Sequence, residues 1–132
     1  MLLHQDLTDS IIKVFYKVYN ALGHGFLEKV YENAVAIELE GHGHRIRQQE
    51  PIKVFYEGHA VGDYFADLIV DDLVILELKA AEAISVAHEA QLLNYLRATE
   101  IEVGLLLNFG VKPQFKRKIY MNDKKEHKSD PR

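Results

Sequence analysis

An apolar run that gains charge only at its end reads Leu73-Val74-Ile75-Leu76-Glu77-Leu78-Lys79. A strand of this composition is apolar on both faces, which is typical of a central strand in a sheet that is covered on two sides. Glu77 and Lys79 are two residues apart, so their side chains leave the same face of the strand. Buried charges must pair, bind a ligand or reach water. The run therefore predicts a central strand with a polar site at its end.

Asp67 lies on the preceding extended run, and its position relative to Glu77 depends on the turn between the two strands. If Val70 pairs with Val74, Asp67 falls opposite Glu77 on the same face of the sheet. If Val70 pairs with Leu73 instead, Asp67 points away, because a slip of one residue reverses every side chain. A site that contains both carboxylates requires the first register.

The residue types at this strand end suit phosphodiester chemistry. Two carboxylates opposed at about 5 Å repel each other unless a cation lies between them, and hard oxygen ligands favour Mg²⁺ or Mn²⁺. A neighbouring lysine can orient or deprotonate the attacking water, or stabilise charge that develops on the phosphate. Asp67, Glu77 and Lys79 are therefore the candidate catalytic residues.

The other elements follow from hydrophobic periodicity. Apolar residues at spacings of three and four predict helices, whereas alternation and short apolar runs predict strands. Asp6 or Thr8 can cap the first helix and Ser85 the third. The expected helices span residues 6–22, 27–41 and 85–99, and the expected strands span residues 45–56, 60–70, 73–79, 102–109 and 115–120. This order, α-α-β-β-β-α-β-β, predicts an α/β fold with a mixed sheet flanked by helices.

Length and composition predict one domain. With 132 residues, the chain suits a single core at residues 1–121, followed by a flexible polar tail at residues 122–132.

The composition limits the possible ligands and partners. The chain contains no cysteine, so a metal would be held by oxygen or imidazole. It shows no leader or membrane span, which predicts a cytoplasmic protein. The net charge of −4 counts weakly against nucleic-acid binding.

Asp67 followed by Glu77-Leu78-Lys79 at a strand end resembles the PD-(D/E)XK nuclease superfamily. Ala66 stands where the eponymous motif has proline, a position that is loosely kept in the superfamily. The resemblance implies a restriction-endonuclease-like fold and a nuclease that depends on Mg²⁺ or Mn²⁺. Asp67 and Glu77 would bind the metal, with the Leu78 carbonyl as a further ligand, and Lys79 would assist the attack.

A second resemblance is carried by Gly25, Glu28 and Tyr31, which match the signature of the bacterial GxxExxY protein family, part of the same superfamily. This resemblance extends to about Tyr120. It implies that Glu28 is a further metal ligand, and Glu28 lies in the first turn of a helix, where the helix dipole favours a carboxylate. Tyr31 is one turn further along and either supports the site and its substrate or is a packed core aromatic.

A third resemblance lies in the helix after the central strand. Gln91 and Tyr95 resemble the QxxxY element of exonucleases of the bacterial recombination type, in which this pair lines the substrate channel. His88 lies one turn earlier on the same face and is a possible substrate contact. An amide can donate to phosphate and a tyrosine ring can stack on an unpaired base.

The hypothesis is therefore a nuclease whose substrate is nucleic acid, DNA rather than RNA. One alternative is a catalytically idle module of the same fold that acts with a protein partner or as a homodimer through the strand at 115–120. A small-molecule enzyme using the same carboxylates ranks third, because no cofactor motif is present. Basic residues form either a phosphate-binding rim or a solvated edge: Arg45, Arg47, Lys53, Lys112, Lys116, Arg117 and Lys118.

Overall fold

The computed structural model describes residues 2–125, and its elements follow the expected order. They are α1 (Gln5–Leu22), α2 (Glu28–Gly41), β1 (Ile46–Tyr56), β2 (His59–Val70), β3 (Val74–Lys79), α3 (Val86–Arg97), β4 (Val103–Phe109) and β5 (Pro113–Ile119), then a short 3-10 helix η1 (Asn122–Lys124). The predicted α/β fold and its order of elements are confirmed. Within the described range, no helix has the length and apolar character needed to cross a membrane.

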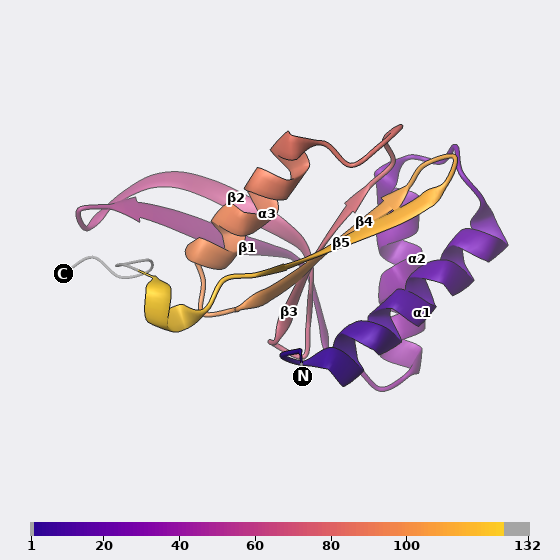
Figure 1. Ribbon diagram of the computed structural model, residues 1–132, viewed down its shortest axis with the longest axis horizontal. Helices are drawn as coiled ribbons and strands as arrows, with labels where there is room; N and C mark the ends of the chain where they lie inside the picture. The colour runs from indigo at the N-terminus through magenta and orange to yellow at the C-terminus, as the bar shows by residue number, and fades with distance from the viewer. Residues whose placement is uncertain (1, 126–132) are drawn as a thin grey trace.

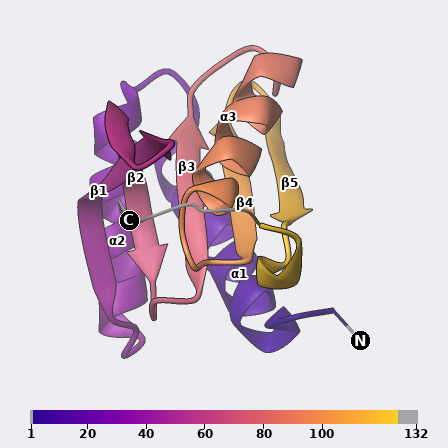
Figure 2. The same cartoon turned by 90° about the vertical axis from the view of Figure 1, so that its left-hand side faces the viewer.

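The five strands form one mixed sheet in the order β1-β2-β3-β4-β5 (Figure 2). β1, β2 and β3 are antiparallel neighbours, β3 and β4 are parallel, and β5 returns antiparallel to β4. α3 forms the crossover between the two parallel strands, as a parallel pair requires. β5 lies at an edge of the sheet, as predicted.

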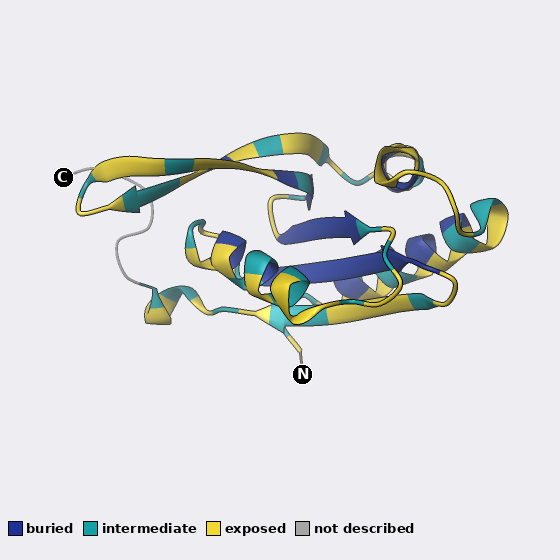
Figure 3. Cartoon of the chain, turned by 90° about the horizontal axis from the view of Figure 1, so that it is seen from above, coloured by how far each residue is buried: buried dark blue, intermediate teal, exposed yellow. Residues whose placement is uncertain are grey.

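The helices cover both faces of the sheet. α1 and α2 pack on one face and α3 on the other (Figures 1 and 2). On β3, Leu76 and Leu78 belong to the core under α1 and α2, whereas Ile75 belongs to the core under α3. Every residue of β4 is buried, and β3 is buried as far as Leu78 (Figure 3). The predicted central strand covered on two sides is therefore confirmed.

The starts of the helices depend on local caps. Ser85 caps α3 as predicted: its Oγ accepts from the His88 N–H (3.1 Å), and His88 Nδ1 accepts from the Ser85 N–H (3.1 Å). The predicted caps of α1 are wrong, because this helix begins at Gln5 after His4, which places Asp6 and Thr8 inside it. The Thr8 hydroxyl instead donates to the Gln5 carbonyl.

The beginning of the predicted flexible tail is hydrogen-bonded to the domain. The Asn122 N–H donates to Glu102 (2.7 Å), and Lys125 Nζ donates to the carbonyls of Thr99 (2.9 Å) and Ile101 (2.8 Å). These bonds connect residues 122–125 to the loop before β4, and the flexible tail remains a prediction. Residues 126–132 lie outside the described range.

We predict that Gly104→Ala destabilises the fold. A Cβ on Gly104 would lie 2.6 Å from Leu92 Cδ1, and Leu92 is fully buried in the core under α3, so it has little room to move. Overpacking of this kind costs about 1–3 kcal/mol. Urea denaturation should show this loss. Gly41→Ala, whose Cβ would meet nothing within 4 Å, should show none, and equal stability of the two variants would contradict the packing argument.

Candidate active site

The sheet opens at Asp67. The ladder between β2 and β3 runs only from Val70 opposite Val74 to Leu68 opposite Leu76. This is the register that a two-carboxylate site requires. Its continuation would place Asp67 opposite Glu77, yet no backbone pairing follows Leu68. The two strands therefore separate where the candidate site begins.

Two reciprocal hydrogen bonds bridge the opening. The Asp67 N–H donates to Glu77 Oε2 (2.8 Å), and the Leu78 N–H donates to Asp67 Oδ2 (2.8 Å). Each carboxylate thus accepts the backbone N–H of the facing strand, where a regular sheet would supply a carbonyl. The exchange holds the carboxylates of Asp67 and Glu77 together at the end of β3.

The other side of Asp67 is irregular as well. Gln48 pairs with Leu68 and Glu50 with Ala66, but Gln49 and Asp67 between them do not pair. Gln49 has a φ of 52°, a left-handed conformation that non-glycine residues rarely adopt. The buried side chains of β2 also change sides here: Leu68 packs under α1 and α2, and Ala66 packs under α3. Asp67 therefore lies at a twist of the β1–β2 hairpin, unpaired on both sides.

Burial makes the carboxylate pair costly to ionise. Glu77 is 3% exposed, and burial, followed by the negative charge of Asp67, raises its pKa from 4.5 to about 8. Burial and the charge of Glu32 likewise raise the pKa of Asp67, against the lowering effect of the Leu78 N–H. Lys79 offsets part of both shifts. The pair needs a proton or a cation to relieve its repulsion.

Lys79 is connected to α3 by a chain of hydrogen bonds. Its Nζ donates to Gln91 Oε1 (3.1 Å), and Gln91 Nε2 donates to the Tyr95 hydroxyl (3.1 Å). Burial, followed by the charge of Glu77, raises the pKa of Tyr95 to about 12. The crossover places α3 next to β3, so Gln91 and Tyr95 of α3 lie at the same end of β3 as Lys79 and the carboxylates.

Two acidic residues of α2 lie near the opening. Glu28, the predicted ligand, is exposed, and its Oε2 accepts from the Ala80 N–H just after β3 (3.3 Å). Glu32 is only 4% exposed and was not among the predicted site residues. Its position four residues after Glu28, on a helix face that is otherwise apolar, is the sequence signal that could have identified it.

Glu32 is linked to the site by glutamines of β1. Gln49 Nε2 lies between Glu32 Oε1 (2.9 Å) and Asp67 Oδ1 (3.3 Å), and Gln48 Nε2 donates to Glu32 Oε2 (2.6 Å). Lys29 Nζ also contacts Glu32 Oε2 (2.9 Å). The left-handed backbone of Gln49 therefore aims its amide at two carboxylates.

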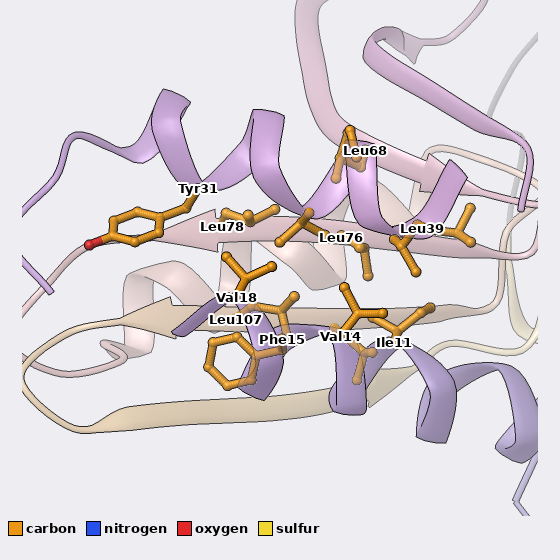
Figure 4. Close-up of a cluster of buried hydrophobic side chains, with 14 of the residues drawn as sticks. Ile11, Val14, Phe15, Val18, Tyr31, Leu39, Leu68, Leu76, Leu78 and Leu107 are labelled. Atoms are coloured by element: carbon orange, nitrogen blue, oxygen red, sulfur yellow. The ribbon is translucent and has the colours of Figure 1, made fainter. Parts of the chain in front are cut away.

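Tyr31 lies in the core, which favours the packed aromatic over the substrate contact, the two roles that the sequence left open. Its side chain is fully buried and belongs to the cluster of buried side chains in Figure 4. Its ring stacks on Phe109 at 4.2 Å between centroids. Its hydroxyl donates to the Gly23 carbonyl (2.6 Å) and accepts from the Phe26 N–H (3.2 Å). Tyr31 therefore fixes the turn before α2, where Gly25 has the left-handed φ of 109° expected of it.

His88 has a structural role at one ring nitrogen, because Nδ1 completes the cap of α3. A substrate contact for His88 remains a prediction.

Most of the predicted basic residues contact acceptors on their own surface, which favours a solvated edge over a phosphate-binding rim. Arg45 and Arg47 reach Asp72, Lys53 reaches Asp63, Lys118 reaches Glu89, and Arg117 reaches the Leu3 carbonyl.

The donor set suits a hard cation only in part. Asp67 and Glu77 supply oxygen, and their pKa values are raised by burial first and by neighbouring negative charge second, both of which a divalent ion would offset. Among residues 2–125, however, no three carboxylate or imidazole side chains stand together as ligands. Glu28 does not join the other two carboxylates in one group.

We predict that the metal-free protein loses stability as the pH rises. Glu77 keeps its proton to about pH 8 when folded but loses it near 4.5 when unfolded, so its contribution is complete below 4.5 and is lost between 4.5 and about 8. The loss should be on the order of 2–4 kcal/mol. Urea denaturation in EDTA across this range measures it.

Glu77→Gln should flatten this pH dependence, since an amide oxygen can still accept from Asp67 but does not titrate. Glu40→Gln, an exposed change on α2, should leave the wild-type curve intact. A wild-type slope in Glu77→Gln would show that another group causes the effect.

Comparisons with known proteins agree with this fold. The model of a family described as the PD-(D/E)XK nuclease superfamily matches residues 5–118. No curated protein matches the chain. Among solved structures, the crystal structure of SSO0001 is similar in fold, with a TM-score of 0.54 and 16% sequence identity. The match covers 70% of this chain and 50% of the SSO0001 chain. Since the family model matches most of its length, the chain belongs to the PD-(D/E)XK nuclease superfamily.

Proposed function

We propose that this protein is a Mg²⁺- or Mn²⁺-dependent nuclease of the GxxExxY type that hydrolyses phosphodiester bonds in DNA. The observation that carries the proposal is the reciprocal pairing of Asp67 and Glu77 beside Lys79 at the opening of the sheet. A buried carboxylate pair whose pKa values are raised, next to a lysine, is typical of a functional site. Membership of the superfamily supports this reaction type.

Asp67, Glu77 and the Leu78 carbonyl would hold the metal, with Glu28 as a further ligand after a movement of its exposed side chain. Glu32, which carries a charge close to Asp67, is the other acidic group within the site. A bound divalent ion supplies Lewis-acid stabilisation of negative charge on the phosphate.

Lys79 would orient the attacking water and take part in its deprotonation. Gln91 Oε1 accepts a hydrogen bond from Lys79 Nζ and so sets the direction of this side chain, while Tyr95 holds Gln91 in turn. Glu77 and Tyr95 are buried, so they keep bulk water from the end of β3 where Lys79 lies. The exclusion of water strengthens the electrostatic interaction of Lys79 with the carboxylates.

A catalytically idle module that acts with a protein partner or as a homodimer is the second candidate. The observation in its favour is that no group of three metal-ligating side chains stands together in the described part of the chain. The net charge of −4 also suits a protein partner as well as a nucleic acid.

We predict that Lys79→Ala lowers cleavage about 10²–10⁴-fold, the usual effect of losing an acid–base group. Labelled single- and double-stranded DNA and RNA should be incubated with each protein in Mn²⁺, Mg²⁺ or EDTA. Lys17→Ala, which removes an exposed ammonium from α1, is the matched control and should cleave like the wild type. No cleavage by the wild type with either metal would favour the idle module.

We also predict that Mn²⁺ stabilises the wild type against heat. At a hundredfold excess over its Kd, a ligand of the folded state adds about 2.7 kcal/mol. Asp67→Asn should abolish the rise in Tm, whereas Asp63→Asn, an exposed change on the same strand, should keep it. A rise that persists in Asp67→Asn would place the ion elsewhere, and this readout does not depend on cleavage.

A further inference from the structure

We propose that a groove between the β1–β2 hairpin and α3 binds a single-stranded segment of nucleic acid by stacking unpaired bases on tyrosines. The inference rests on the proposed function for its class of ligand. It goes beyond the carboxylate site, because it assigns a binding surface to the hairpin and to the segment after β5.

The groove is a cavity of about 780 Å³. One wall is the outer part of the hairpin, the other is α3, and Tyr120 and η1 close one end; these segments lie together in Figure 1. Sites of about 300–1,000 Å³ bury most of the surface of a drug-sized ligand. The cavity is therefore large enough for part of a single strand.

Tyrosines from both walls face this space. Tyr56 (66% exposed) and Tyr64 (48% exposed) come from the hairpin, and Tyr95 comes from α3. The Tyr64 and Tyr95 rings are 5.9 Å apart and tilted by 49°, so the Tyr64 ring contacts one wall and leaves part of its surface open. Tyr95 is buried, so the rings that can serve as stacking platforms for bases of any sequence are those of Tyr56 and Tyr64.

The charge of the groove also favours a phosphate backbone. Arg97, Lys124 and Lys125 line it, and none of the described lining residues is acidic, although the whole chain has a net charge of −4. The Arg97 guanidinium lies over the Tyr120 ring at 5.9 Å, and Lys125 is fixed by two backbone carbonyls. The cations are thus concentrated beside the aromatic rings, the combination found in single-strand binding sites.

The groove leads to the carboxylates. Gln91 and Tyr95 line it and also form the hydrogen-bond chain that ends at Lys79. A strand whose bases stack on Tyr64 would therefore have its backbone directed toward the end of β3. Stacking requires bases that are unpaired, which favours a single strand over a duplex.

The test is fluorescence anisotropy of a labelled twelve-residue oligothymidylate in EDTA, which measures binding without cleavage. Tyr64→Ala should weaken binding about tenfold, and Tyr64→Phe should stay within about twofold of the wild type, because the ring that stacks is kept. Phe65→Ala is the matched control: Phe65 is the next residue of β2, is similarly exposed at 52%, and does not line the groove. Circular dichroism melts check that each variant is folded.

Wild-type affinity in Tyr64→Ala, equal loss in Phe65→Ala, or a duplex bound as tightly as the single strand would overturn the groove assignment. A failure of the proposed function gives a different result: the protein does not cleave DNA with Mn²⁺, but binding in EDTA still depends on Tyr64. Cleavage that is intact without any effect of Tyr64 on binding would support the nuclease and overturn the groove.

Discussion

The reciprocal bonds between Asp67 and the end of β3 are the constraint from which the site follows. A buried backbone N–H must have an acceptor, and here the acceptors are carboxylates of the facing strand. The same oxygen atoms therefore complete the sheet and carry the charge of the site. This double use explains how β2 and β3 can separate at Asp67 without leaving unsatisfied N–H groups.

The opening also determines what surrounds the carboxylates. Because the part of β2 before Leu68 does not pair with β3, the hairpin is free to twist, and its outer part faces α3 rather than α2. The parallel crossover brings α3 back over the end of β3, which places Gln91 next to Lys79. A polar site and an aromatic groove thus share one helix, with the hydrogen-bond chain between them.

The sequence predicted the fold well, because periodicity, turn residues and the apolar run of β3 all agree with one order of elements. It also predicted that Glu77 and Lys79 lie side by side, since residues two apart on a strand share a face, and it named the register that brings Asp67 to them. Gln49 and Glu32 could not be found in this way, because their role depends on a left-handed backbone and on the packing of α2 beside β1. For Tyr31, spacing on a helix did not determine whether its ring faced the site or the core.

Gln49 illustrates how folding and activity can select different residues at one position. Glycine adopts a φ near 52° without steric cost, whereas glutamine at this φ is strained. Only glutamine, however, has an amide that reaches both Glu32 and Asp67. A directed-evolution screen for heat resistance alone would accept glycine here, whereas a screen for the proposed cleavage would retain glutamine, so the residue selected at this position would distinguish the two properties.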